Sequence, residues 1–226
     1  MSLTEKKLKM KPRFKKWCHT LAFVFVWGIT VFAEGQSISD DMVAIPKGIV
    51  QWSEKTISIP QFYMDQYETI QQSYERTTGE NPSYFKGPNR PVEKVNWFEA
   101  DKYCKSNRKR LPTEWEWEWA AQLGEKIDFS KKAAENLGWF KNNSKLMTHP
   151  VGQKKQNPFG LYDMTGNVWE WTSSDHENGG KVMRGGSWRN SASSMRPSKR
   201  LMSLSHYRYH YVGFRCAVSL NPKLEN

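Results

Sequence analysis

Residues 160–171 read GLYDMTGNVWEW, and the rest of the chain is interpreted around this stretch. Its three large aromatic residues carry more apolar surface than a loop can leave in water, so we expect the segment to be buried. Gly160 and Gly166 allow backbone conformations that residues with a Cβ rarely adopt. Asp163 and Glu170 therefore place two acids beside a buried and irregular backbone.

A buried, irregular backbone leaves carbonyl oxygens free of regular hydrogen bonds. A hard cation such as calcium binds carboxylate and carbonyl oxygens together, so the two acids are candidate calcium ligands. The alternative is that both acids cap turns and accept hydrogen bonds from loop amides. The spacing of the residues leaves both interpretations open.

The same stretch resembles the GLYD/N-hydrophobic-x-GNxWEW motif of the formylglycine-generating-enzyme family, whose domains are also called sulfatase-modifying-factor domains. Seven further matches follow the family's order after residue 41: MVAIPKG (42–48), FYMDQYE (62–68), RPVEKVNWFEADKYC (90–104), RLPTEWEWEWAA (110–121), HPVGQKKQNPFG (149–160), RGGSW (184–188) and GFRC (213–216). Each motif is modest alone, but their common order makes the resemblance specific. It implies an α+β fold, a variant of the C-type-lectin fold with two helices, short strands and little regular structure.

Composition limits the classes of function. The 226 residues suffice for one substantial core, and 11 Trp, 11 Phe and 9 Tyr suit a fold whose loops are held together by aromatic packing. Of the net charge of +11, residues 1–33 contribute +6 from seven bases and one acid, and the remaining 27 bases and 22 acids contribute +5. Because the positive charge is concentrated in the leader, we expect no nucleic-acid partner.

The leader, residues 1–33, is expected to be a signal peptide. A basic start precedes the apolar run of residues 21–32, and Val31-Phe32-Ala33 fits the rule for cleavage. The alternative is an uncleaved anchor, since residues 17–33 are just long enough to span a membrane. Cleavage would yield a monomeric protein in the periplasm, at the cell surface or secreted, with no membrane span. The expected organisation is a signal peptide (1–33), a linker (34–41), one domain (42–220) and a tail (221–226).

Without the leader the chain keeps two cysteines, Cys104 and Cys216. An oxidising compartment favours a disulfide between them, and the family resemblance implies the same pair. Such a bond closes a loop of more than a hundred residues and would stabilise the fold by about 2–5 kcal/mol. Two buried free thiols are the alternative.

Two helices are the best-defined local elements. A capping box formed by Asn96 and Glu99 marks the start of a helix at residues 96–106. A second capping box, formed by Thr113 and Glu116, marks the start of the helix that follows residue 113. In the second helix we interpret the Trp-Glu repeats as core packing rather than carbohydrate stacking, with one face formed by Trp115, Trp119 and Leu123.

Other elements are expected to be short. The pattern predicts a strand at 42–48, a hairpin-like pair at 56–59 and 62–67, a helix within 68–78 ending at Gly79, a loop at 80–90, irregular chain at 124–152, and late strands at 181–184 and 213–218.

The catalytic members of the family oxidise a sulfatase cysteine to formylglycine through two copper-binding cysteines that follow RGGSW. Copper(I) is soft and prefers thiolate sulfur. The resemblance aligns the two positions with Asn190 and Met195, and an amide and a thioether do not replace two thiolates. We therefore expect no copper, no catalytic residue and no formylglycine generation by this mechanism. The alternative is an oxidoreductase with altered metal chemistry that uses His206, His210 or Met195.

The resemblance also implies one calcium site, formed by the side chains of Asp163 and Glu170 and the backbone of Gly166 and Val168. A second calcium site of the family would begin at Asn136, but its later ligands have no counterpart before residue 149.

The late loop, residues 189–211, is rich in Ser, Asn, Arg, His and Tyr, and Tyr and Arg are frequent in binding surfaces. It also resembles the frame of diversity-generating-retroelement variable proteins, with Arg196 and Arg200 at the fixed arginines. We expect contacts to a protein or glycan ligand from Arg189, Asn190, Ser191, Ser193, Ser194, His206, Tyr207, Arg208, His210 and Tyr211. The alternative is a solvated loop whose tyrosines pack on the core.

The sequence thus predicts an exported sulfatase-modifying-factor-like domain that lacks the copper cysteines. Its expected function is to bind a protein or glycan ligand, or to serve as an accessory factor for envelope proteins. A purely structural role in a surface assembly is a third possibility.

Overall fold

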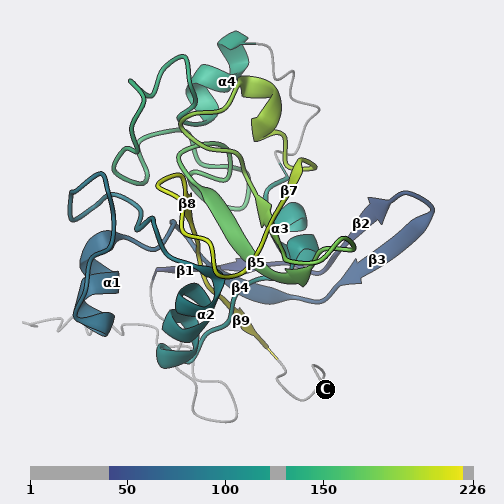
Figure 1. The fold of residues 1–226 in the computed structure, drawn as a ribbon. Helices are drawn as coiled ribbons and strands as arrows, with labels where there is room; N and C mark the ends of the chain where they lie inside the picture. Colours follow the sequence, from purple (N-terminus) through teal and green to yellow (C-terminus); the bar gives the residue numbers. More distant parts are fainter. Residues whose placement is uncertain (1–40, 123–130, 221–226) are drawn as a thin grey trace, which may run out of the picture. The chain divides into compact units, whose positions relative to one another are not determined.

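The computed structural model describes residues 41–122 and 131–220, and within them it contains four α-helices, a 3-10 helix and nine short strands (Figure 1). The predicted α+β class is confirmed, although the helices outnumber the two expected. The predicted signal peptide, all but the last residue of the linker, and the tail lie outside the described residues. Within the described part of the chain, no helix is both long and apolar enough to cross a membrane.

The strands form three small sheets. One contains β1 (Met42–Ile45), β4 (Phe62–Asp65) and β9 (Ala217–Ser219) in the order β1-β4-β9. The second is the hairpin of β2 (Gly48–Trp52) and β3 (Lys55–Ile59), which extends away from the other strands in Figure 1. The third has the order β7-β6-β5-β8 and contains β5 (Trp169–Asp175), β6 (Lys181–Arg184), β7 (Arg200–Ser203) and β8 (Val212–Gly213).

The predicted pairing of residues 56–59 with 62–67 is wrong. Strand β3 pairs with β2, whereas β4 pairs with β1 and β9. Trp52 lies opposite Lys55, so two residues form the turn, and the first of them, Ser53, has a φ of 54°. A turn with positive φ matches the twist of a hairpin, which explains why β3 folds back on β2 instead.

The predicted helix caps are confirmed. Helix α2 (Trp97–Ser106) begins with the capping box of Asn96 and Glu99, and α3 (Glu114–Ala120) begins with that of Thr113 and Glu116. Helix α1 (Gln71–Thr78) ends at Gly79, which has a φ of 81°. It begins later than the predicted window because the preceding backbone bonds to a distant segment: the Thr69 amide donates to the Phe214 carbonyl.

Three elements were not predicted: α4 (Lys131–Leu137), the 3-10 helix η1 (Ala192–Met195) and β7. Helix α4 and η1 have only seven and four residues, and α4 lies within residues 124–152, whose polar pattern wrongly predicted irregular chain. Their buried residues share a small cluster formed by Ala134, Phe140 and Met195.

The tryptophan face predicted for α3 is partly wrong. Trp117, not Trp115 or Trp119, is fully buried, while its two neighbours are half-buried and Leu123 lies outside the described residues. The expectation of core packing holds, since the Trp117 ring is part of the cluster around β1, β4 and α3. The Trp119 indole donates a hydrogen bond to the Pro46 carbonyl, and Trp115 packs on Trp52 with ring centroids 5.1 Å apart.

The predicted disulfide is confirmed: Cys104 of α2 is bonded to Cys216, which immediately precedes β9. Both residues belong to the larger core cluster, together with Trp169, Trp171 and Phe214. The stretch 160–171 therefore runs through the centre of the fold, and all residues from 163 to 172 are buried, as predicted.

Candidate functional site

The two positions aligned with the copper cysteines are used to hold the fold together. The Asn190 Oδ1 accepts hydrogen bonds from the Trp169 indole at 2.9 Å and from the Ser187 hydroxyl at 2.5 Å. Met195 is fully buried on η1. Neither side chain provides a thiolate, and each already has a packing role.

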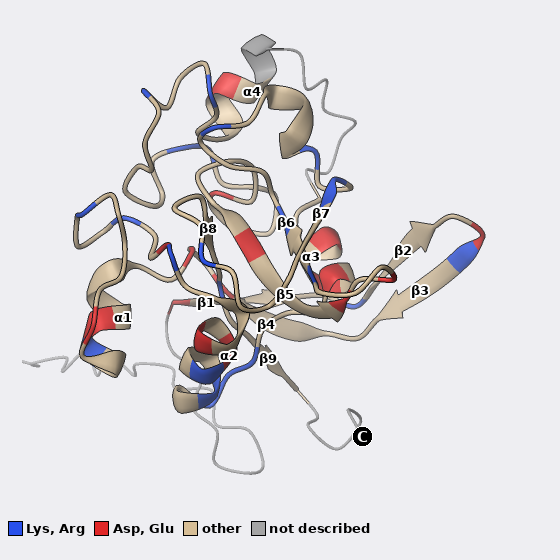
Figure 2. Cartoon of the chain, in the orientation of Figure 1, with Lys and Arg blue, Asp and Glu red and all other residues tan. Residues whose placement is uncertain are grey.

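Glu170 lies on β5 and is paired with a buried arginine; Figure 2 shows acidic residues on β5 and on α3. The Arg215 guanidinium donates to both Glu170 oxygens, with both distances 2.8 Å, and also to the Tyr162 carbonyl. The Trp117 indole donates to Glu170 Oε2 at 2.7 Å. Because Glu170 and Arg215 are both fully buried, the pair is tolerated only through this dense set of hydrogen bonds.

Two further carboxylates lie near this pair. Asp163, with a φ of 56°, accepts the Gly152 amide at 2.7 Å on one oxygen, while its Oδ1 has no hydrogen-bond partner among the described residues. Burial raises the pKa of Asp163 to about 6. Glu68 accepts hydrogen bonds from Asn167 and Val168, and burial, followed by the charges of Asp163 and Glu170, raises its pKa. Glu170 thus pairs directly with the Arg215 guanidinium, and the charges of Glu68 and Asp163 act on it from nearby.

The predicted calcium ligands can be compared with this geometry. Asp163 fits a hard cation, because Oδ1 is buried and unpaired. Glu170 fits less well: Oε2 already accepts two donors, Oε1 keeps one lone pair, and the Arg215 charge would repel a cation. Among the described residues, no cluster of three or more His, Cys, Asp and Glu side chains is placed to hold a metal ion. Calcium remains a prediction that rests mainly on Asp163.

The predicted ligand residues of the late loop fall into two groups. Ser191, Ser193 and Ser194 lie at η1, where the first two hydroxyls bond to each other, and Asn190 turns inward. The other group comprises five residues between β7 and β8: His206, Tyr207, Arg208, His210 and Tyr211.

Two contacts position the second group. Arg208 forms an ion pair with Glu99 of α2, at 2.6 Å. The Arg189 guanidinium lies 4.7 Å from the Tyr211 ring centroid, which brings the segment after RGGSW beside the end of the late loop.

Sequence reasoning missed the aromatic residues that complete this region. The Phe85 ring lies 5.3 Å from Trp188, His210 lies 5.5 Å from Trp188, and Tyr84 lies 5.9 Å from His210. The Tyr84 side chain is 67% exposed. We call the following set the aromatic surface, in which Trp188 is the buried member against which Phe85 and His210 pack: Tyr84, Phe85, Trp188, Arg189, His210 and Tyr211.

The loop that presents Tyr84 and Phe85 is held by buried polar side chains. Gln71 of α1 donates to the carbonyls of Phe85 and Pro91. Its Oε1 accepts hydrogen bonds from the Asn81 side chain and the Gly87 amide, so this one side chain ties together four points of the loop. Such bonding fixes the exposed rings in place before a partner arrives.

Glu93 also holds this loop in place through hydrogen bonds. Its Oε1 accepts the Phe85 amide at 2.7 Å, and its own amide donates to the Ser83 hydroxyl. The carboxylate is fully buried and its Oε2 has no hydrogen-bond partner within the described part of the chain. Burial raises the pKa of Glu93 from 4.5 to about 7.

The predicted frame arginines differ in environment. Arg200 donates to Glu114 and Glu177 and lies over the Trp52 ring, at 4.8 Å from its centroid. Arg196 is exposed. Arg200 therefore fixes β7 against α3 and the β2–β3 hairpin.

Comparison with solved structures defines the class of fold. The chain is similar to Treponema denticola variable protein 1, with a TM-score of 0.69 and 26% identity over 79% of this chain and 94% of that one. It is also similar to PvdO from Pseudomonas aeruginosa, with a TM-score of 0.66 and 22% identity over 79% and 94% of the two chains. The fold is thus the formylglycine-generating-enzyme-like variant of the C-type-lectin fold.

Sequence comparison gives the family. Residues 30–220 match the model described as "Sulfatase-modifying factor enzyme 1-like domain", so the chain belongs to the formylglycine-generating-enzyme family. It is 30% identical over 247 aligned residues to "Chaperone protein LppX" of Paenibacillus barcinonensis, covering 77% of this chain and 88% of the relative. It is 35% identical over 158 residues to "Inactive C-alpha-formylglycine-generating enzyme 2" of Mus musculus, covering 60% of this chain and about half (51%) of that relative.

Proposed function

We propose that this domain is a non-catalytic, chaperone-like accessory factor that holds an extended or partly folded protein segment on the aromatic surface. The observation that carries the proposal is one continuous set of ring contacts, formed by three separate segments, in which Tyr84 and Arg189 are exposed and Phe85, His210 and Tyr211 are half-buried. Rigid aromatic residues and arginine contribute most of the binding energy in many protein interfaces.

The non-catalytic part of the proposal is supported by the two positions that follow RGGSW. Asn190 is hydrogen-bonded to Trp169 and Ser187, and Met195 is buried beside Phe140. Both side chains stabilise the loop that would otherwise carry the copper thiolates. The similarity to a relative named an inactive enzyme agrees with this interpretation.

A protein ligand is favoured over a glycan by one comparison. The relative named a chaperone protein matches over 88% of its own length, so the likeness covers most of that protein rather than a shared motif. An oxidising, exported location is part of the proposal, since the Cys104–Cys216 disulfide requires a compartment where disulfides persist.

The proposal is tested by an aggregation assay. Chemically denatured citrate synthase is diluted into buffer with or without the purified protein, and light scattering is followed. We expect the wild type to suppress scattering and the double variant Tyr84→Ser/His210→Ser to lose most of that effect. The matched control is Ile49→Ser on β2, which removes an apolar side chain of similar exposure (54%) outside the aromatic surface.

The following outcomes would contradict the proposal. One is a wild-type protein that does not suppress light scattering, or a double variant that suppresses it as well as the wild type does. The other is stoichiometric binding of copper(I) with consumption of O₂, which would favour the oxidoreductase alternative. Protection by the wild type that is abolished by a soluble oligosaccharide would indicate a glycan ligand instead.

A further inference from the structure

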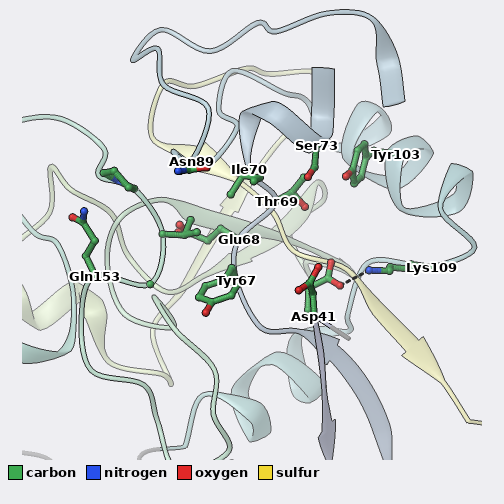
Figure 3. A pocket seen from close by; sticks show the side chains of 14 residues that line it. Asp41, Tyr67, Glu68, Thr69, Ile70, Ser73, Asn89, Tyr103, Lys109 and Gln153 are labelled. Atoms are coloured by element: carbon green, nitrogen blue, oxygen red, sulfur yellow. Dashed lines mark hydrogen bonds and ion pairs between the residues drawn. The ribbon is translucent and has the colours of Figure 1, made fainter. Parts of the chain in front are cut away.

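A cavity of about 570 Å³ opens where β4 leads into α1, and none of its lining residues belongs to the aromatic surface. Its wall includes Thr69, Ser73, Tyr103, Asp41 and Lys109, which Figure 3 labels. This volume lies within the range of small-molecule sites, roughly 300–1,000 Å³.

The charges that line the cavity are unequally compensated. Asp65 is bound by the Lys109 ammonium and by the Cys216 amide, so its carboxylate has partners. Asp41 is exposed, and none of the ion pairs found between described residues includes it. Glu68 lines the same wall, but burial raises its pKa and disfavours its charged form, so the excess of negative charge comes from Asp41. The wall therefore carries more negative than positive charge.

An aromatic ring lines the same cavity as the uncompensated acid. Tyr67 lines the cavity and is stacked on Tyr162, with ring centroids 5.0 Å apart. Asp41 lines the same cavity, and both side chains are labelled in Figure 3. A carboxylate and an aromatic ring that line one cavity together attract organic cations.

One buried polar group in the wall has no partner. Thr69 is only 7% exposed, and its hydroxyl has no hydrogen-bond partner among the described residues. Buried hydroxyl groups are nearly always hydrogen-bonded, so an unpaired one in a cavity wall points to a ligand that completes the bond.

We propose that this cavity binds a small aliphatic amine, with its ammonium group on Asp41 and against Tyr67, and with a second polar group hydrogen-bonded to Thr69. A metal ion fits less well, because Lys109 already neutralises Asp65, and Glu68 directs both oxygens to Asn167 and Val168. The cavity is also much larger than a hydrated ion requires.

The test is isothermal titration calorimetry of the purified protein with putrescine, and with butane-1,4-diol as a neutral ligand of nearly equal length. We expect putrescine to bind and the diol to give no heat. Asp41→Asn should weaken putrescine binding at least about tenfold, the effect of losing one charged contact. The matched control, Asp175→Asn, removes an exposed acid that pairs with Lys181 and should bind putrescine like the wild type.

Three outcomes would overturn the proposal: no binding of putrescine at millimolar concentration, equal binding of the diol, or unchanged affinity in Asp41→Asn. Far-UV circular dichroism of the variant confirms its fold. The backbone carbonyl of Asp41, which accepts the Gln66 amide, is kept by the substitution. Because the cavity shares no residue with the aromatic surface, the aggregation assay reports on the chaperone-like function separately.

Discussion

Arg215 is the residue on which the buried centre depends most. It neutralises Glu170 and satisfies carbonyl oxygens from two other segments, so its removal would leave a carboxylate uncompensated in the core. Losing one partner of a buried ion pair is far more costly than losing an exposed one.

We therefore expect Arg215→Met to lower the free energy of unfolding by about 3–5 kcal/mol. Urea denaturation under non-reducing conditions measures the loss. Arg208→Met is the control, because Arg208 pairs with Glu99 at the surface and should change stability by less than about 1 kcal/mol. Equal losses of unfolding free energy in the two variants would show that the buried Arg215–Glu170 pair contributes no more to stability than the exposed Arg208–Glu99 pair.

Asp163 is the residue that decides the calcium proposal. Its buried Oδ1 is unpaired, and a cation bound there would stabilise the folded state over the unfolded one. We expect calcium to raise the Tm of the wild type and to have no effect on Asp163→Asn, measured by thermal denaturation with calcium and with a chelator. Asn tolerates the left-handed backbone at this position, so the variant should fold. A calcium effect that survives in the variant would place the ion elsewhere.

The buried Glu93 carboxylate should make the stability of the folded protein fall as the pH rises. Its pKa is raised from 4.5 to about 7 in the folded protein because the side chain is buried, so the folded state binds the proton more tightly than the unfolded chain. The stability contributed by this group is complete below pH 4.5 and is lost as the pH rises through about 7.

Glu93→Gln should therefore flatten the decline in stability between pH 4.5 and 7, measured by urea midpoints across that range. Glu99→Gln is a control of opposite sign. Burial raises the pKa of Glu99, but hydrogen bonds from Arg208 and the Asn96 amide outweigh that effect and lower it. The Glu99 variant should lose stability above its ordinary pKa. Parallel pH profiles for wild type and Glu93→Gln would disprove the assignment.

At the scale of elements, the capped helices were predictable and the strand pairing was not. A capping box occupies four consecutive residues, so Asn96 and Thr113 identify the starts of α2 and α3 from local chemistry alone. By contrast, β4 pairs with β9, which lies more than 150 residues later in the chain, and no local pattern encodes that partner.

The loop of residues 80–90 is an element without regular structure that is nevertheless fixed. Gln71→Ala would remove the four hydrogen bonds made by the Gln71 side chain, and we expect faster hydrogen exchange at the Gly87 amide, which loses its acceptor, together with weaker suppression of aggregation. The neighbouring Gln72→Ala changes an exposed side chain and should leave both properties unaltered. If the loop amides of Gln71→Ala exchanged hydrogen at the wild-type rate, other contacts would be holding the loop in place.

At the scale of the whole molecule, the Cys104–Cys216 disulfide closes a loop of 112 residues that contains the central motif and the four-stranded sheet of β5, β6, β7 and β8. Replacing both cysteines with alanine should reduce the free energy of unfolding by about 2–5 kcal/mol, because the unfolded chain gains conformational freedom. Chemical denaturation of the oxidised protein and of the double variant measures the difference. A loss below about 1 kcal/mol would mean that the reduced chain is already constrained.

The sequence by itself determined the family, the burial of most of residues 160–171, with Gly160 and Tyr162 only half-buried, the disulfide partners and the two capped helices. The helix starts and the buried stretch follow from hydrogen-bond chemistry and apolar content within short windows, whereas the family and the disulfide partners follow from the order of motifs along the chain. Only the tertiary structure decided that Arg215 compensates Glu170, and that Tyr84 and Phe85 join His210 in one surface. Those contacts connect residues from 45 to more than 120 positions apart, and their free energy arises from burial and charge pairing that exist only once the chain has folded.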